Sequence, residues 1–218
     1  MLKRLKVWSI AAAATVLMSA TAMAAPVIDF ATGDASAGGQ VFLSGSNVIG
    51  TNVPIGIVRI FGAPANNGNF DVFGTAPSFG TTRLFGDFDF SQANNTVSLT
   101  GCIPGLGVGT FANGQCTEPV TLLSGTLASV QNFNNNLVIA FGEDTKNATL
   151  LAAIGLSANT PFSMTSTLQT VGNFGQGVGN SSPSISTDIR NTAVPEPATM
   201  MLLGTGLLAA FRARRRTA

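Results

Sequence analysis

The chain has 218 residues, of which only 10% are charged, and it contains no histidine and no tyrosine. Soluble domains usually carry about 25% charged residues, so polarity here must come from Ser, Thr and Asn side chains and from paired backbone. The absence of histidine excludes a Ser–His–Asp or Cys–His nucleophile within the chain, and any zinc site built on imidazole. The low charge argues against charge-driven disorder and against a basic nucleic-acid binder, so no nucleic-acid partner is expected.

The first 24 residues have the organisation of a secretory signal peptide. Met1–Lys6 is basic, Val7–Met18 is apolar, and Ala22 and Ala24 provide the small residues that a signal peptidase requires on the N-terminal side of its cleavage point. A permanent anchor would need roughly 20 apolar residues, more than this run contains. We therefore predict export through the Sec translocon and cleavage by signal peptidase after Ala24.

The middle of the chain has the pattern of an all-β domain. Gly, Pro and Asn clusters recur about every 8 to 12 residues, and short runs of β-type composition lie between them. We predict a single β-sandwich of jelly-roll type over residues 25–171, although the pattern does not distinguish a sandwich from a barrel. Strands are expected at Gln40–Ser44, Ile55–Phe61, Leu84–Phe90, Thr96–Thr100, Val120–Leu123, Thr126–Val130, Leu137–Phe141, Thr149–Leu156, Ser163–Val171 and Ser184–Ile189.

Several local features refine this prediction. Two hairpins are expected, one turning at residues 91–95 and the other at the Asn-rich residues 132–136, because Asn tolerates turn conformations. Thr149–Leu156 could be helical from its Leu and Ala content, but its flanking turn residues favour a strand. The region from Ala31 to Gly80 is richer in Gly, Pro and Asn and is expected to be loop-heavy around its predicted strands. Fourteen phenylalanines between Phe30 and Phe174 should supply most of the large core side chains.

Cys102 and Cys116 are the only cysteines of the chain. In an exported protein an even number of cysteines favours a disulfide. The segment between them is rich in glycine, so a cross-link of this size would stabilise the fold by about 3 kcal/mol. Catalytic redox pairs lie closer together in sequence, so we predict a structural disulfide.

The acidic residues offer the remaining candidates for chemistry. Asp87 and Asp89 are two residues apart on a predicted strand and share one face, and Glu143 and Asp144 are expected in a turn. Paired carboxylates can hold calcium or act in a glycosidase, whereas the simpler interpretation is a solvated sheet face. Asp87 and Asp89 are the candidate metal ligands, and no cofactor is expected.

The C-terminal region consists of a spacer and a membrane signal. Residues 172–193 are expected to form a spacer that leaves room for a last strand. Val194, Pro195, Glu196 and Pro197 follow, and the two prolines must keep this segment extended. The apolar run of residues 198–211 would form a transmembrane helix about 21 Å long, somewhat short of the hydrocarbon core of about 30 Å. The terminal arginines Arg212, Arg214, Arg215 and Arg216 should hold its end in the cytoplasm.

This order of elements over residues 194–218 resembles the PEP-CTERM sorting signal of bacterial exported proteins. The same tail is also labelled as an ice-binding protein C-terminal domain, which describes the sorting tail and not an activity. The resemblance implies recognition by an exosortase, an integral-membrane cysteine transpeptidase that would cut near Pro195-Glu196-Pro197. It implies nothing about the fold or activity of residues 25–190.

Together these features predict a non-enzymatic, exported protein of the cell surface or extracellular matrix, of structural or adhesive type. Its expected partners are the exosortase, signal peptidase, the Sec translocon, the inner membrane during transit, and exopolysaccharide. Two alternatives stay open. One is a secreted polysaccharide-active hydrolase that uses Asp87, Asp89 or Glu143, and the other is a calcium- or glycan-binding adhesion module.

Overall fold

A computed structural model of the protein describes residues 25–33, 35, 38–78, 80–133, 136–170, 181–194 and 204–207. The chain divides into two compact units, Ala25–Val194 and a unit formed by Met1–Ala24 with Pro195–Ala218. The predicted signal peptide lies outside the described residues. So does the predicted C-terminal helix, except for residues 204–207, which are helical. In the part of the chain that the structure describes, no helix is long and apolar enough to cross a membrane.

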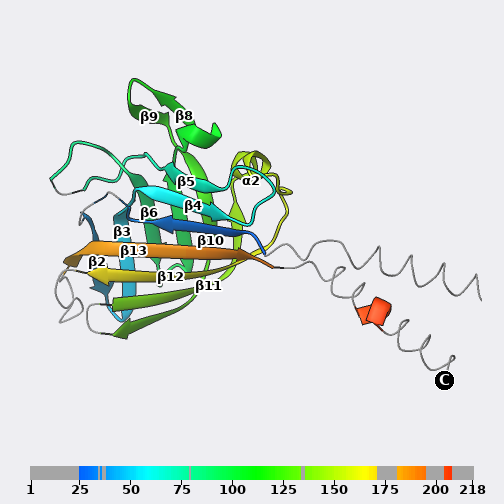
Figure 1. The fold of residues 1–218 in the computed structure, drawn as a ribbon. Helices are drawn as coiled ribbons and strands as arrows, with labels where there is room; N and C mark the ends of the chain where they lie inside the picture. The colour runs from blue at the N-terminus through cyan, green and yellow to red at the C-terminus, as the bar shows by residue number, and fades with distance from the viewer. Residues whose placement is uncertain are drawn as a thin grey trace, which may run out of the picture. The chain divides into compact units, whose positions relative to one another are not determined.

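The unit Ala25–Val194, called the body below, consists mainly of antiparallel strands, which confirms the all-β prediction (Figure 1). A short 3-10 turn, η1 (Pro104–Leu106), and one helix, α2 (Ala148–Ala153), interrupt them. The strands are β1 Val27–Ala31, β2 Gly38–Ser44, β3 Asn47–Ile55, β4 Ile57–Phe61, β5 Gly68–Asp71, β6 Gly86–Ser91, β7 Thr96–Gly101, β8 Thr110–Ala112, β9 Gln115–Glu118, β10 Val120–Phe133, β11 Asn136–Lys146, β12 Phe162–Thr170 and β13 Ser181–Ala193.

All strands except the hairpin β8–β9 belong to one sheet, in the order β12-β11-β10-β7-β6-β3-β2-β13-β1-β4-β5. An additional pairing between β12 and β13 closes the sheet on itself, so that β2, β3, β6, β7, β10, β11, β12 and β13 form a ring. One edge of β13 pairs along β12, and its other edge pairs with β2 at Ser181–Ser184 and with β1 at Asp188–Thr192. The strands β1, β4 and β5 therefore branch from the ring at β13.

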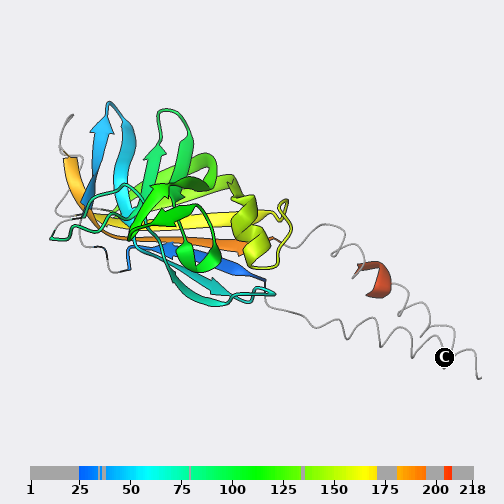
Figure 2. The ribbon, with the colours of Figure 1, turned by 90° about the horizontal axis from the view of Figure 1, so that it is seen from above.

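This closure refines the predicted jelly-roll sandwich. Strands β3 and β6 cross behind β13 and β12, so opposite walls of the sheet pack face to face as in a sandwich (Figures 1 and 2). Hydrogen bonds nevertheless continue from wall to wall around the ring, so the walls are not the two separate sheets of a jelly roll. Closing a sheet removes unpaired strand edges, which are the sites where β proteins aggregate.

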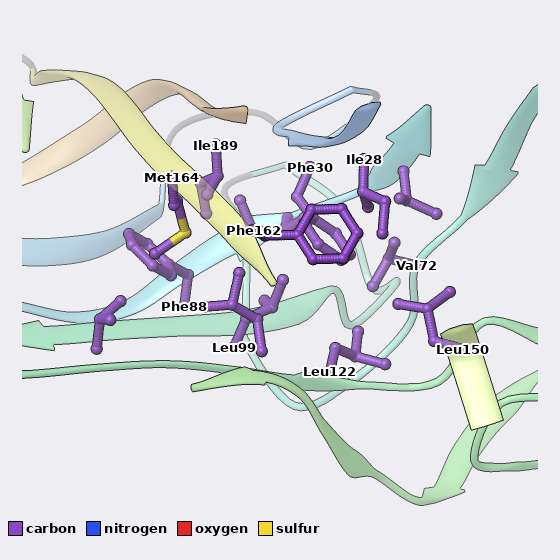
Figure 3. Packing of buried hydrophobic residues seen from close by; sticks show 14 of the residues in the cluster. Ile28, Phe30, Val72, Phe88, Leu99, Leu122, Leu150, Phe162, Met164 and Ile189 are labelled. Atoms are coloured by element: carbon purple, nitrogen blue, oxygen red, sulfur yellow. The ribbon is translucent and has the colours of Figure 1, made fainter. Parts of the chain in front are cut away.

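The inward-facing side chains form one apolar core (Figure 3). The largest fully buried side chains are those of Phe30, Phe85, Phe88 and Phe90, so phenylalanines do supply large core side chains. Most other core members are Val, Ile and Leu, so aliphatic side chains contribute more of the packing than we expected.

The observed strands match the predicted ones with a few corrections. Val120–Leu123 and Thr126–Val130 are parts of the single long strand β10. Both predicted hairpins are present, with β6 returning into β7 and β10 into β11. The last strand, predicted at Ser184–Ile189, extends over the whole of β13 and takes up residues 181–193 of the predicted spacer; residues 172–180 lie outside the described residues.

The predicted strand Thr149–Leu156 is wrong, because helix α2 occupies this segment. The side chain of Asn147 accepts hydrogen bonds from the backbone N–H groups of Thr149 and Leu150, at 2.9 and 3.2 Å. Asn147 is therefore a helix N-cap, and Gly155, with φ +79°, takes the left-handed conformation typical of a residue just past a helix. The turn residues that suggested strand boundaries are the two ends of a helix.

The region Ala31–Gly80 contains more strand than its composition predicts. Strands β2 and β4 overlap the predicted strands Gln40–Ser44 and Ile55–Phe61, whereas β5 and most of β3 were not predicted. Some of its turn-forming residues serve the strands themselves. A Cβ at Gly50 would lie 2.1 Å from the ring of Phe90, so the missing side chain makes room for a core aromatic. Asn52, with φ +53°, lies at an irregularity in the pairing of β3 with β6.

Candidate functional site

The predicted acidic pair lies on β6 as expected, on one face of the strand. Asp89 Oδ1 accepts a hydrogen bond of 2.8 Å from the backbone N–H of Asn52, so this carboxylate holds the irregular part of β3 in place. Asp87 Oδ2 accepts from the Thr75 hydroxyl at 3.4 Å. Burial and the charge of Asp89 raise the pKa of Asp87 to about 6, against the effect of the Thr75 hydrogen bond.

The structure adds no third ligand to this pair. Among the described residues no three His, Cys, Asp or Glu side chains are grouped closely enough to hold a metal ion. Glu143 was predicted in a turn, which is wrong. It lies in strand β11, opposite Ser163 of β12, and its side chain lies outside the described residues.

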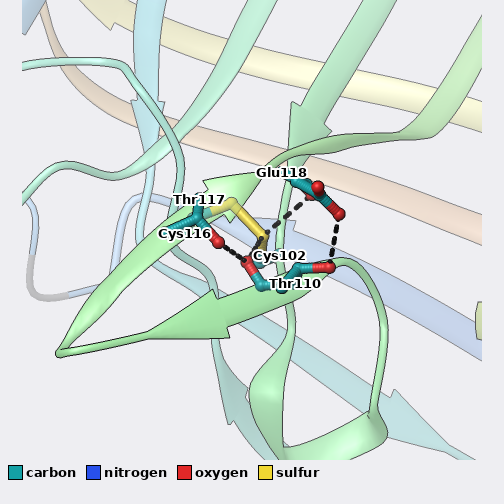
Figure 4. The surroundings of a disulfide bond; sticks show 5 residues. All are labelled: Cys102, Thr110, Cys116, Thr117 and Glu118. Atoms are coloured by element: carbon teal, nitrogen blue, oxygen red, sulfur yellow. Dashed lines mark hydrogen bonds between the residues drawn. A yellow bond between two sulfur atoms is a disulfide. The ribbon is translucent and has the colours of Figure 1, made fainter.

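The predicted disulfide between Cys102 and Cys116 is present (Figure 4). Its Cα atoms are 5.7 Å apart, and it joins the fully buried Cys102, which follows β7, to the hairpin β8–β9. Within the hairpin, Thr110 Oγ1 donates to Glu118 Oε2 at 2.8 Å, and the Thr117 hydroxyl donates to the Thr110 carbonyl at 3.2 Å. The disulfide therefore anchors a small, separate two-stranded sheet to the main one.

A second charged cluster was not singled out from the sequence. The register places Arg190 of β13, Asp29 of β1 and Arg59 of β4 in one row across the sheet. Arg59 Nη1 lies 3.1 Å from Asp29 Oδ2, and Asp188 lies two residues before Arg190 on the same strand. Hydrogen bonding to Asp29, partial burial and the charge of Asp29 raise the pKa of Asp188 to about 6, whereas Arg59 and Arg190 oppose this rise.

A buried ion pair was missed as well. Strand β11 continues beyond the predicted end at Phe141, and Asp144 and Lys146 both point into the body with fully buried side chains. Lys146 Nζ lies 2.5 Å from Asp144 Oδ2 and 4.8 Å from the ring centre of Phe162. Burial lowers the pKa of Lys146 to about 8 and raises that of Asp144, and the charge of each partner counteracts both shifts.

The predicted sorting segment begins at Val194, directly after the last residue of β13. The backbone N–H of Ala193 donates to Pro26 at 2.8 Å, and that of Val194 donates to Pro161 at 2.8 Å. Val194 itself is 43% exposed, so the last described residue of the body is open to solvent. The predicted sorting residues Pro195, Glu196 and Pro197, the arginines at 212 and 214–216, and the signal-peptidase residues Ala22 and Ala24 lie outside the described residues.

Comparison with known proteins identifies this tail. Residues 193–216 match the PEP-CTERM protein-sorting motif, which confirms the resemblance seen in the sequence. The motif implies that the chain is exported and presented to an exosortase. No curated protein and no solved structure matches the chain.

Proposed function

We propose that this chain is a non-enzymatic structural or adhesive protein of the cell surface or extracellular matrix, released from the inner membrane by an exosortase. The observation that carries the proposal is the sorting motif at residues 193–216. Exopolysaccharide is the proposed partner of the mature protein. Signal peptidase and the Sec translocon are the proposed partners during export.

The position of the motif supports this processing. The last strand ends at Ala193, where the motif begins, so a cut within Val194–Pro197 would leave every pairing of β13 in place. Pro195 and Pro197 have no backbone N–H and cannot continue the sheet. The chain therefore leaves the body at a point where an extended segment can enter the active site of a processing enzyme.

The build of the body supports an extracellular role. A disulfide is stable in an oxidising compartment, and the closed sheet offers few unpaired strand edges. Among the acidic candidates for catalysis, Asp89 has a structural role, because its carboxylate accepts a hydrogen bond from the backbone of β3. A polysaccharide-active hydrolase remains the alternative, because Asp87 has the raised pKa that a general acid needs. Hydrolysis of host polysaccharide that disappears in Asp87→Asn would establish that alternative.

The processing claim is tested by replacing Pro195-Glu196-Pro197 with three alanines in the native host. We expect the wild-type protein in surface fractions to begin at Ala25 and to end between residues 194 and 197, apart from any attached group. The alanine variant should remain in the inner membrane and still end at Ala218. Intact-mass measurement distinguishes the two forms.

A matched control replaces the Glu118-Pro119 pair in the body with two alanines, which removes the same residue types from a place outside the motif. This control should be processed like the wild type. Normal processing of the variant at residues 195–197 would exclude recognition by an exosortase.

A further inference from the structure

A pocket of about 420 Å³ opens beside the disulfide-bonded hairpin β8–β9, which projects beyond the main sheet in Figure 1. The loop Thr81–Leu84 forms one wall, the hairpin tip from Asn113 to Cys116 forms the other, and Phe73 also lines the pocket. We infer that this pocket binds a neutral saccharide, an inference that rests on the proposed surface or matrix function. Small-molecule sites usually have volumes of about 300–1,000 Å³.

The hairpin wall is held in a fixed position. Asn113 and Gly114 have φ angles of +53° and +79°, as a tight two-residue hairpin turn requires. An isolated two-stranded hairpin is marginally stable, so attachment to the main sheet matters. The disulfide provides one attachment, and the ring of Phe111, centred 4.6 Å from that of Phe73, provides the other.

The loop wall is held by Arg83. Its guanidinium group lies 4.2 Å from the ring centre of Phe73 and 4.9 Å from that of Phe85. The same group lies 3.2 Å from Asp71 Oδ1. Because both walls are fixed before a ligand arrives, binding does not have to order them, which favours affinity.

The groups that line the pocket suit a hydroxyl-rich, uncharged ligand. Thr81 and Thr82 provide hydroxyls, and Asn113 and Gln115 provide amides, so each can both donate and accept hydrogen bonds. Leu84, 43% exposed, adds an apolar surface beside them. Sugars present the same combination of hydroxyls and apolar C–H faces.

Charge argues against an acidic ligand. Arg83 is the only charged residue among those that line the pocket, and Asp71 compensates it. A uronate or a phosphate group would find no other cation there. The inferred ligand class is therefore a neutral saccharide.

The test is isothermal titration of the full chain, purified in the sugar-free detergent lauryldimethylamine oxide. The probes are cellohexaose, laminarihexaose and maltohexaose, with hexagalacturonate as the acidic comparison. We expect at least one neutral hexasaccharide to bind and hexagalacturonate to bind at least tenfold more weakly.

The double variant Asn113→Gly, Gln115→Ala removes both amides while glycine keeps the turn conformation at residue 113. It should raise the Kd for the bound sugar about tenfold or more.

The matched control is Gln40→Ala, which removes an exposed glutamine from the lining of a different pocket, of about 390 Å³. This variant should bind like the wild type, and all variants should melt at the wild-type temperature. Absence of binding to all three neutral hexasaccharides would overturn the inference, as would unchanged affinity of the double variant. The processing experiment uses a different readout, so a flat titration with normal processing refutes the saccharide site and leaves the proposed function intact.

Discussion

At the scale of single residues, the ion pair Asp144–Lys146 makes stability sensitive to substitution. Both side chains are fully buried, so each charge depends on the other for compensation. Removing one partner of such a pair typically costs about 3–5 kcal/mol, whereas replacing both with apolar residues of similar size is close to neutral. We expect Asp144→Ala to lower the free energy of unfolding by about that amount and the double variant Asp144→Leu, Lys146→Met to restore most of it. Chemical denaturation measures both, and equal losses in the two variants would contradict this account.

The raised pKa values of Asp87 and Asp188 predict a dependence of stability on pH. Each group has a pKa of about 6 in the folded body against 3.8 for an unperturbed carboxyl. The folded state therefore keeps protons that the unfolded state loses between these values. The contribution is fully present below pH 3.8 and is lost as the pH rises through about 6.

We accordingly expect the double variant Asp87→Asn, Asp188→Asn to lose less stability than the wild type between pH 4 and pH 7. Thermal unfolding at several pH values, at constant ionic strength, measures the difference between the two proteins. Parallel curves would show that neither carboxyl has the inferred shift. Glu118→Gln is the control, because it removes a carboxyl elsewhere in the body and keeps Asp87, Asp188 and the neighbouring charge of Asp89.

Sequence reasoning found two local pairs and missed the cluster that depends on register. It also missed the local pair Asp144–Lys146, because the strand that carries it was predicted to end at Phe141. The disulfide was predictable because the exported chain has two cysteines, Cys102 and Cys116. The shared face of Asp87 and Asp89 was predictable because the two residues are two apart on a strand. Asp29 and Asp188 come together only because β1 pairs with β13 in one particular alignment. A shift of that register by one residue would turn their side chains to opposite faces, and no local pattern specifies the alignment.

At the scale of elements, the hairpin β8–β9 depends on its disulfide. It pairs with no other strand of the described body, and η1 and Gly-rich turns connect it to β7. We expect the double variant Cys102→Ala, Cys116→Ala to be less stable by about 3 kcal/mol, since a cross-link over 14 residues restricts the unfolded chain. Denaturant unfolding with and without reductant checks this. Reductant should weaken the wild type alone, and a wild type that reductant does not affect would contradict the assignment.

Residue type alone predicts some elements correctly and others wrongly. Strands with clean alternation, such as β7, and hairpins with Asn-rich turns were predictable because their signals are local. Asn147 has the same composition signal as a turn residue, but its side chain caps helix α2. Gly50 looks like a strand breaker, yet it makes space for Phe90 within β3. Tertiary packing decides the role of Gly50, and single-sequence propensity does not contain that packing. The cap at Asn147 is a local hydrogen-bond pattern, and Asn before a run of Leu and Ala is a helix-start signal that the sequence already carried.

At the scale of the whole molecule, composition and turn spacing sufficed for the all-β class, whereas the closure of the sheet was not predictable. The closure depends on β13 pairing with β1 and β2, which lie more than 130 residues earlier in the chain. Pairings so distant in sequence make folding slow, in the range of about milliseconds to seconds for comparable β proteins.

The position of β13 at the end of the body determines when the sheet can close during export. This strand is the last part of the body to leave the ribosome and to cross the membrane, yet it joins β12, β2 and β1. Until Ala193 has crossed the membrane, the ring lacks the strand that closes it. The ring can therefore close only after the chain up to the start of the sorting motif has been exported, so the body gains its closed sheet at the end of export and not before.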